Sequence, residues 1–288
     1  MIIVSSKEGQ LCNRLFHFSS FIANAIEYKY KLVYPCFDEY EPFFVATSTN
    51  DFQGYPISVN ILKGGVFNNL IVKYLNKLKN KLPFGMVYHD IKDYDDRVQL
   101  FQMNYDEEFQ QLVHSKTVVA HGWLYRDEAN IRKHKPIIRQ LFAPVPEYKA
   151  KADAVIAKAR ENVDYVIGVH IRRGDYKEFL DGKFFYEDTV YLNKMREVAA
   201  LMDAQGKTYR FLICSNEKLD LAVFGNLPVS FEPRHFITDL YALTGCNYIM
   251  GPPSTFSLWA SYYGDVPLYT IDDKDRLILT LNNFNLIY

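Results

Sequence analysis

Two adjacent arginines, Arg172 and Arg173, end the apolar run 166–171 in the segment YVIGVHIRRGDYKEF. A guanidinium group is permanently charged and can bind phosphate oxygens through two parallel hydrogen bonds, so this pair is suited to a diphosphate. Gly174 allows a tight turn after the strand, and Asp175 could orient one of the arginines. Two other interpretations stay open: the arginines bind surface carboxylates, or residues 173–175 form an adhesive Arg-Gly-Asp tripeptide.

A second candidate for phosphate binding is the segment 250–264, MGPPSTFSLWASYYG, in which a glycine–proline turn leads into a helix at Ser254 and Thr255. Serine and threonine are preferred at helix N-termini, where unpaired backbone amides attract phosphate. Capping alone explains a serine at this place, but capping and phosphate binding are compatible. The segment therefore adds to the case made by the arginines.

A third candidate is the turn EGQLCNRLF near the N-terminus, with Gly9 between a strand and a helix and with Asn13 and Arg14 as its polar residues. The turn lacks the G-x-G-x-x-G spacing of a dinucleotide-binding loop. It remains a candidate for contact with a phosphate or a sugar.

These segments are positioned by an alternation of short apolar runs and helix-period segments, which predicts an α/β fold with mostly parallel strands. Ligands of doubly wound sheets bind beyond the carboxyl ends of strands. The prolines of APVPEYK, which begins at Ala143, predict a boundary between domains 1–145 and 146–288. We expect two Rossmann-like domains that face a cleft. The expected strands are 1–5, 31–34, 117–120, 166–171, 211–214, 248–250 and 266–271, and the expected helices are 11–25, 72–84, 126–142, 187–204, 239–244 and 254–263.

The hexapeptide HIRRGD (170–175) resembles the H-x-R-R-x-D motif of the α-1,2-fucosyltransferases, a family related to the α-1,6- and protein O-fucosyltransferases. Three further segments resemble this family and occur in its order. They are GQLCNRLFHFSSFIANA, HGWLYRDEANIRKHKPIIRQLFAP and ITDLYALTGCNYIMGPPSTFSLWA. Two departures are Cys12 and Arg14, where the family commonly has glycine and glutamine, and only Trp259 remains of its paired tryptophans. These departures leave the acceptor and the exact donor sugar open.

The resemblance implies a GT-B glycosyltransferase whose C-terminal domain binds GDP-fucose and whose N-terminal domain lies on the acceptor side. It implies an inverting transfer of L-fucose from GDP-β-L-fucose to a glycan or lipid-linked oligosaccharide, with α-1,2 linkage, in the synthesis of a surface polysaccharide or oligosaccharide. Another GDP-sugar donor is the alternative. The donor residues implied are Gly9, Asn13, His170, Arg172, Arg173, Asp239, Ser254, Thr255 and Phe256.

In such a transfer the leaving GDP gains negative charge, which Arg172, Arg173 and the helix start at Ser254 would stabilise without a metal or another cofactor. Asp175 and Glu178 are candidates for the base by proximity, and Arg172 is the main catalytic candidate. Arg14 and His17 are candidates on the acceptor side, although a structural role is expected for a histidine at this place.

The totals limit the alternatives. Lys plus Arg number 33 and Asp plus Glu number 34, so the overall charge does not favour a nucleic acid partner. The four cysteines form no C-x-x-C pair and predict neither a metal site nor a disulfide framework. The D-x-D strings at 93–95 and 273–275 would suit a metal-dependent transferase, a less favoured alternative because strings this short recur by chance.

The expected location is cytoplasmic, because the chain starts with a strand-like run without a secretion signal and has no apolar stretch of membrane-spanning length. The segment VKYLNKLKNKLPF (72–84) has two interpretations. It is a surface helix packed through its leucines, or a basic amphipathic helix that contacts the inner face of an anionic membrane.

Overall fold

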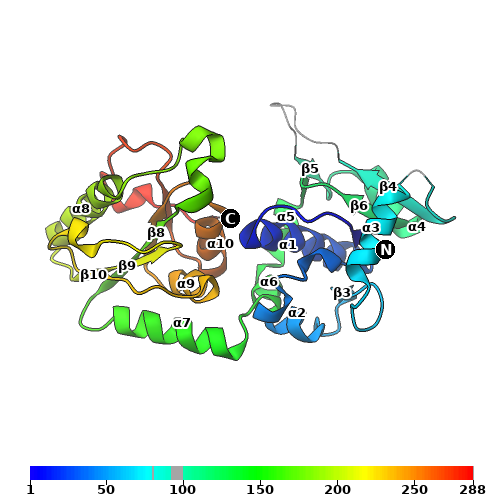
Figure 1. Ribbon diagram of the computed structural model, residues 1–288, viewed down its shortest axis with the longest axis horizontal. Helices are drawn as coiled ribbons and strands as arrows, with labels where there is room; N and C mark the ends of the chain where they lie inside the picture. The colour runs from blue at the N-terminus through cyan, green and yellow to red at the C-terminus, as the bar shows by residue number, and fades with distance from the viewer. Residues whose placement is uncertain (80, 92–99, 288) are drawn as a thin grey trace. The chain divides into compact units, whose positions relative to one another are not determined.

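The computed structural model describes residues 1–79, 81–91 and 100–287. The chain divides into two compact units, Met1–Val145 and Pro146–Tyr288, and each is an α/β unit around a parallel sheet (Figure 1). Pro146 is the first residue of helix α7 (Pro146–Ala159), a position that suits proline because the first turn needs no intrahelical amide donor. The expected α/β class is confirmed.

Unit 1 contains, in its described part, a sheet with strand order β3-β2-β1-β6-β4, in which all neighbours are parallel. The central strand β1 is buried throughout, as expected when helices cover both faces. The strands are β1 (Ile2–Val4), β2 (Leu32–Val33), β3 (Ile57–Ser58), β4 (Met86–Asp90) and β6 (Thr117–His121), and β5 (Phe101–Gln102) pairs separately with β7 (Tyr125–Arg126). The helices are α1 (Leu11–Tyr28), α2 (Val45–Thr49), α3 (Asn68–Lys77), α4 (Glu107–Ser115), α5 (Glu128–Lys133) and α6 (Lys135–Leu141), with short 3-10 turns at Pro35–Phe37 and Glu41–Phe43.

The helix expected at 72–84 is confirmed only for residues 72–77, since α3 begins at Asn68 and ends at Lys77. Pro83, which has no amide hydrogen to donate within a helix, also excludes a regular helix through residue 84. Leu75 and Leu82 nevertheless pack inward against the same apolar cluster as Ile3 of β1. The packing role of these leucines is confirmed, and the helical role of Leu82 is wrong.

The single helix expected at 126–142 is also wrong. Arg126 belongs to β7, and two short helices, α5 and α6, follow with a break at His134. Pro136 lies in the first turn of α6, where its missing amide hydrogen is harmless, whereas in a continuous helix it would remove a hydrogen bond.

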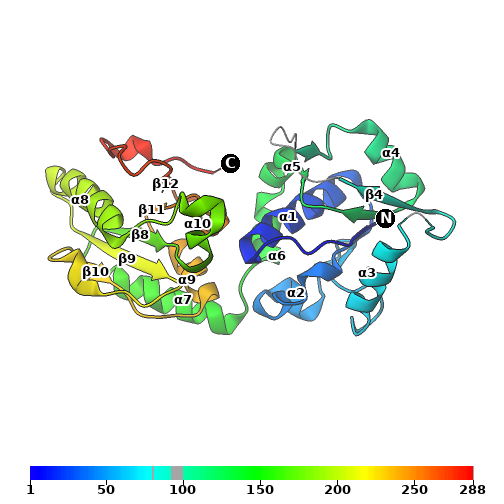
Figure 2. The same cartoon turned by 45° about the horizontal axis from the view of Figure 1, so that its top comes forward.

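Unit 2 contains, among its described residues, a sheet with strand order β10-β9-β8-β11-β12, again with parallel neighbours (Figure 2). Its long central strand β8 is almost wholly buried. The strands are β8 (Tyr165–Ile171), β9 (Tyr209–Ser215), β10 (Val229–Ser230), β11 (Tyr248–Gly251) and β12 (Leu268–Thr270), and the helices after α7 are α8 (Asp188–Ala204), α9 (Phe236–Leu243) and α10 (Thr255–Gly264). Short 3-10 turns lie at Gly174–Lys177, Phe179–Gly182, Leu221–Phe224 and Leu281–Asn283.

The alternation of side chains along β8 decides which residues reach the site. Val169 and Ile171 pack in the core formed with α8. Gly168 and His170 point to the opposite face, where a side chain on Gly168 would meet Leu243 of α9. His170 is thus placed beneath α10 by strand register alone.

Candidate functional site

The strand order of unit 2 reverses between β8 and β11, because the chain proceeds from β8 to β9 on one side and later returns to β11 on the other. The loops that follow β8 and β11 lead in opposite directions, and doubly wound sheets bind their ligands at the carboxyl ends of the two strands between which the order reverses. Arg172 directly follows β8, and Ser254 follows β11. The fold therefore brings the two phosphate-binding candidates of this unit to the same edge.

Arg172 lies at the surface of this edge, with its side chain 17% exposed. Its Nη2 atom is 2.7 Å from Oδ1 of Asp175, whose side chain is 51% exposed. The guanidinium also lies over the ring of Tyr176, 5.5 Å from its centroid. Arg172 is thus held by an acidic and an aromatic neighbour, both from the short turn that follows it.

Arg173 is placed differently from Arg172. Its side chain is buried, forms an ion pair with Asp188 in the first turn of α8, and lies over the ring of Phe185. Its backbone amide donates a hydrogen bond to Oδ1 of Asn216, at 3.0 Å. Arg173 therefore ties the loop to α8, and its charge is compensated within the protein. This burial also contradicts the alternative in which residues 173–175 are displayed as an adhesive tripeptide.

His170, a buried residue of β8, contacts the start of α10. Its Nδ1 atom lies 2.8 Å from Oγ of Ser257, and its ring contacts Phe256 with centroids 4.8 Å apart. Burial, together with the neighbouring charge of Arg172, lowers the pKa of His170 to about 3. The imidazole is therefore neutral at physiological pH and connects β8 with the start of α10.

The first turn of α10 completes this part of the site. Oγ of Ser254 caps the helix by accepting a hydrogen bond from the amide of Phe256 at 3.3 Å, as the sequence predicts. The first turn of a helix carries amides without intrahelical partners, and these favour an anion. Thr255 and Phe256 are partly exposed beside the cap.

Tyr176 connects the arginine to this helix start and was not among the predicted site residues. Its ring lies under Arg172, and its hydroxyl donates a hydrogen bond to the carbonyl of Pro253, next to Ser254. The sequence signal is an aromatic residue four positions after Arg172, and in a chain with 22 tyrosines such a spacing carries little information.

Asp239, a predicted donor residue, lies in α9 and is buried. Its Oδ1 atom is 2.6 Å from Nε of Arg234, which also donates to the carbonyl of Ile213 in β9. Burial raises the pKa of Asp239, although the charge of Arg234 partly offsets this effect. The carboxylate is thus engaged by an arginine that the sequence did not single out.

Glu178, the second candidate for a base, is exposed and caps the 3-10 turn Gly174–Lys177. Asp175 lies in the same turn, paired with Arg172. Both carboxylates are accessible to solvent, and they differ in that Asp175 already accepts from a guanidinium.

The glycine turn of unit 1 is fixed by Arg14. This buried side chain donates from Nε to the carbonyl of Gly9 at 3.1 Å, and its Nη1 atom lies 3.1 Å from Glu39. Gly9 has φ +63°, and a Cβ there would collide with the side chain of Asn13. Asn13 is half-buried at the turn. Arg14 therefore stabilises the turn as a buried residue and is not one of its exposed polar residues.

His17 lies in the core of unit 1. Its Nδ1 atom is 2.7 Å from the hydroxyl of Tyr34, and its ring stacks on Trp123 with centroids 5.6 Å apart. Burial, followed by the charge of Arg126, lowers the pKa of His17 to about 3. These contacts favour the structural role over contact with an acceptor.

The two D-x-D strings, 93–95 and 273–275, were the candidates for a metal site. Residues 93–95 lie outside the described residues. In the other string, Oδ1 of Asp273 accepts a hydrogen bond from the amide of Asp275 at 2.9 Å, which is the geometry of a turn. Within the described ranges, no group of three or more His, Cys, Asp or Glu side chains is placed to hold a metal ion. All four cysteines, each in the described part, are buried and free of disulfides.

No family model and no curated protein match this chain. Solved structures of fucosyltransferases are similar in fold. NodZ from Bradyrhizobium has a TM-score of 0.59 at 18% identity, covering 96% of this chain and 97% of NodZ. A FUT1 mutant from Arabidopsis thaliana in complex with GDP has a TM-score of 0.59 at 14% identity, covering 95% and 71%. POFUT1 in complex with GDP-fucose has a TM-score of 0.54 at 11% identity, covering 92% and 94%. The chain has the GT-B type of fold found in these proteins.

Proposed function

We propose that this chain is an inverting glycosyltransferase that transfers L-fucose from GDP-β-L-fucose to a hydroxyl group of a glycan. The observation that carries the proposal is the position of Arg172, partly exposed where the strand order of the unit 2 sheet reverses and beside the first turn of α10. Support comes from the fold, which is shared with fucosyltransferases whose structures hold GDP or GDP-fucose.

In the proposed reaction, an acceptor oxygen forms a bond to the anomeric carbon of fucose. The bond from that carbon to the β-phosphate oxygen breaks, its electron pair leaves with GDP, and the acceptor proton passes to a base. Arg172 and the amides at Ser254 and Thr255 stabilise the charge that builds on the β-phosphate, so the reaction as proposed needs no metal. Neutral His170 and paired Arg173 hold these groups in place without adding a free charge.

The finer parts of the proposal are an α-1,2 linkage and a role in building a surface polysaccharide or oligosaccharide on a glycan or lipid carrier. They rest on the resemblance of HIRRGD and of three other segments to the α-1,2-fucosyltransferases. NodZ has this type of fold and is an α-1,6-fucosyltransferase, so the fold is compatible with more than one linkage. Linkage analysis of a purified product would decide between them.

Calorimetric titration tests the donor assignment with GDP-fucose, GDP-mannose and UDP-galactose. Wild type should bind GDP-fucose, and Arg172→Ala should weaken this binding by about tenfold to a hundredfold, since a hydrogen bond to a charged group contributes about 1.5–3 kcal/mol. Arg196→Ala, which removes an exposed arginine of α8, is the matched control and should leave binding unchanged. Equal affinity in wild type and Arg172→Ala would overturn the proposal, and preference for GDP-mannose would favour another GDP-sugar.

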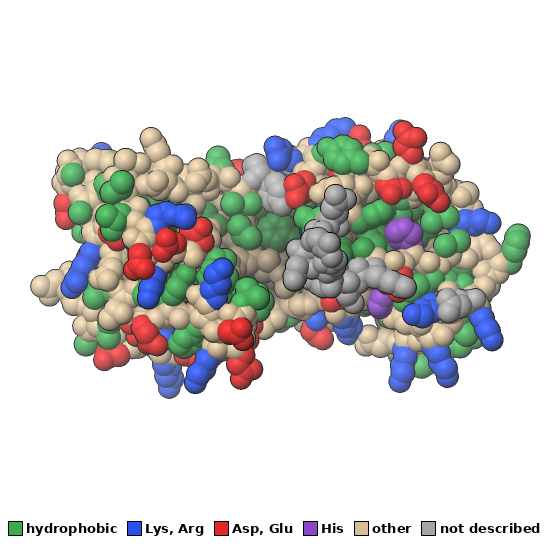
Figure 3. All heavy atoms as spheres, turned by 90° about the horizontal axis from the view of Figure 1, so that it is seen from above, with side chains coloured by type: hydrophobic (Ala, Val, Ile, Leu, Met, Phe, Trp, Pro, Cys, Tyr) green, Lys and Arg blue, Asp and Glu red, His purple; other side chains and the backbone are tan. Residues whose placement is uncertain are grey.

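We also propose that unit 1 contacts an anionic membrane through the predicted segment 72–84 and, in addition, the preceding residues 62–71, together called here the 62–84 surface. None of the described helices is long and apolar enough to cross a membrane. The segment contains five lysines and no Asp or Glu. Figure 3 shows that basic and hydrophobic side chains both reach the surface of the protein on the face that it draws. Lysines near a membrane surface contribute about 1 kcal/mol each when its lipids are anionic. Large hydrophobic side chains are exposed here at Leu62, Val66, Phe67, Leu70, Tyr74 and Phe84.

Co-sedimentation with vesicles tests this contact. The protein should bind phosphatidylglycerol vesicles but not phosphatidylcholine vesicles, and Leu70→Ser combined with Lys73→Glu should remove most of the binding. The matched control is Leu279→Ser, since Leu279 is 68% exposed in unit 2. Equal binding by the double variant and the control would refute the proposed surface.

A further inference from the structure

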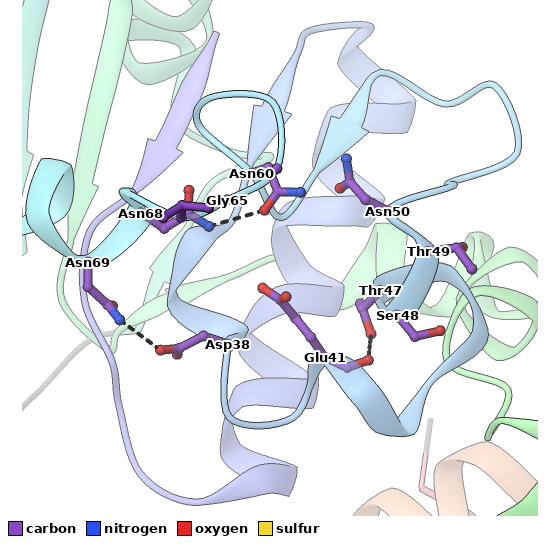
Figure 4. Close-up of a pocket in the computed structure, with 12 residues that line it drawn as sticks. Asp38, Glu41, Thr47, Ser48, Thr49, Asn50, Asn60, Gly65, Asn68 and Asn69 are labelled. Atoms are coloured by element: carbon purple, nitrogen blue, oxygen red, sulfur yellow. Dashed lines mark hydrogen bonds between the residues drawn. The ribbon is translucent and has the colours of Figure 1, made fainter.

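Unit 1 contains a polar cavity of about 380 Å³ between the segment 38–50 and the loop 60–69 (Figure 4). It lies beyond the carboxyl ends of β2 and β3, the edge at which such sheets bind ligands. Its volume is within the range of small-molecule sites. Apart from Val66 and glycines, the lining consists of amide, hydroxyl and carboxylate side chains, and none of the described lining residues is a lysine or an arginine.

Glu41 is the unusual residue of this cavity. Figure 4 shows its side chain extending toward the loop that carries Asn60 and Gly65. Its buried Oε1 atom accepts no hydrogen bond from the described residues. Burial, and then the charge of Asp38, raises the pKa of Glu41 to about 7. The residue as a whole is half-buried, and its Oε1 atom, when the carboxyl group is ionised, is available to accept a hydrogen bond from a ligand.

Asp38, the other carboxylate of the cavity, is already engaged. Lys7 lies 2.6 Å from its Oδ1 atom, and the amide of Asn69 donates to its Oδ2 atom at 3.1 Å. Burial raises the pKa of Asp38, but these hydrogen bonds and the charge of Lys7 outweigh it and lower the value overall. Asp38 thus remains an ionised, compensated neighbour of Glu41.

The amides of the cavity are oriented by bonds within the protein. Oδ1 of Asn50 accepts from the amide of Val59 at 2.8 Å and from Ser58. Oδ1 of Asn60 accepts from the side chain of Asn68 at 3.3 Å. Because the oxygens of these two amides are used in this way, their nitrogens are left to donate to a ligand.

The hydrogen-bond donors and acceptors of the cavity fit a hydroxyl group better than an anion or a calcium ion. An anion would meet two carboxylates and no cationic lining residue. A calcium ion needs about six to eight oxygen ligands, whereas Asn50 and Asn60 offer nitrogens and Asp38 is compensated by Lys7. A hydroxyl group both donates and accepts, so it can bind Glu41 and an amide nitrogen together.

We propose that this cavity binds the acceptor of the transfer reaction through the hydroxyl groups of a neutral sugar, with Glu41 accepting and Asn60 donating hydrogen bonds. The inference rests on the proposed function and adds the class of the acceptor. The cavity is connected to the glycine turn, since Lys7 of the strand–turn segment pairs with Asp38 and Arg14 pairs with the adjacent Glu39.

The experiment uses the full chain with saturating GDP and a glycan array that pairs each neutral glycan with its sialylated form. Neutral glycans should bind. Glycans whose sialic acid is carried on the sugar that enters the cavity should not bind, because the two carboxylates repel the added negative charge. For the best neutral glycan, Glu41→Gln should weaken binding by about tenfold to a hundredfold, because it removes a hydrogen bond to a charged group. Asn60→Ala removes a hydrogen bond between neutral groups and should weaken binding by about twofold to tenfold, and GDP affinity should stay unchanged in both variants.

A glycine pair supplies a matched control for the loop. Gly64 and Gly65 both have positive φ, so alanine strains the backbone at either position. A Cβ on Gly65 would collide with Oδ1 of Asn60, whereas one on Gly64 would meet no atom within 4 Å. Gly65→Ala should therefore weaken glycan binding, and Gly64→Ala should not.

The possible outcomes distinguish failure of the acceptor cavity from failure of the proposed transferase function. Failure of wild type to bind GDP or GDP-fucose overturns the proposed function. Normal GDP binding without any neutral glycan bound, or glycan binding that Glu41→Gln and Asn60→Ala leave unchanged, overturns the acceptor cavity alone. Calcium chloride binding that Glu41→Gln abolishes would also overturn it, in favour of a cation site.

Discussion

Replacing Asp175 by asparagine distinguishes its two potential roles, a brace for Arg172 and a base for the acceptor proton. The carboxylate lies 2.7 Å from the guanidinium and is 51% exposed. A pair this exposed contributes about 0–1 kcal/mol, so Asp175→Asn should change GDP affinity by less than about fivefold. Loss of a general base would instead lower kcat by about 10²–10⁴.

We expect the brace, because a carboxylate that already accepts a charge-assisted hydrogen bond is less available to take a proton. Initial rates of GDP release give kcat, and calorimetry gives the Kd of GDP, for wild type, Asp175→Asn, Glu178→Gln and Arg172→Ala. Only Arg172→Ala should lose GDP affinity strongly, and kcat of Asp175→Asn should stay within about fivefold of wild type. A kcat reduced more than about a hundredfold with an unchanged Kd would show that Asp175 is the base and refute this reasoning.

Three further predictions follow from buried or half-buried charges. Asp188→Asn removes the partner of buried Arg173 and should lower the free energy of unfolding by about 1–3 kcal/mol in urea titrations, the cost of leaving a largely buried charged group without its partner. His170 and His17 have pKa values of about 3 in the folded state, so the protein takes up protons on unfolding below pH 6.5, and the free energy of unfolding should decrease from pH 6.5 towards pH 3. Between pH 6.5 and pH 5 each histidine should account for about 2 kcal/mol of this decrease. In urea titrations at a series of pH values, His17→Gln should therefore show a smaller decrease over this range. Glu41 has a raised pKa of about 7, so the affinity for a neutral glycan should increase as the pH rises from 6 to 8 and Glu41 ionises, a dependence that Glu41→Gln should lack when measured by calorimetry.

Four of the five strands in the sheet of unit 2 were predictable because they are short, continuous apolar runs between clear turns, whereas the two-residue edge strand β10 was missed. The run 166–171 matches β8 closely, and Ser254 caps α10 as expected. Helix limits were less predictable: α3 ends at Lys77 within a run of regularly spaced leucines, and the break between α5 and α6 depends on Pro136, whose effect is local. The periodicity of leucines alone extends a helix past the point where the backbone leaves it.

The chemistry of individual side chains was least predictable, since it depends on partners distant in the sequence. Arg173 turns inward because Asp188 lies in the first turn of α8, 15 residues later. Asp239 is committed to Arg234, and His17 is enclosed by Tyr34 and Trp123. The unit 1 cavity is lined mainly by Asn, Thr, Ser and Gly, together with Asp38, Glu41 and Val66. Most of these are ordinary loop residues, so their convergence appears only in three dimensions.

The arginine pair shows how one dipeptide divides two tasks. The two side chains have different partners, since Arg172 pairs with Asp175 in the turn that follows it and Arg173 pairs with Asp188 of α8. Arg173 is compensated by Asp188 and anchors the loop to α8, while Arg172 stays accessible above neutral His170. In the proposed donor site, an anchored backbone would keep the guanidinium of Arg172 in position before a ligand binds, which would lower the ordering cost of binding. Arg173→Lys should therefore weaken GDP binding less than Arg172→Lys does, since a single ammonium can still pair with Asp188 but cannot reproduce bidentate contact with a phosphate.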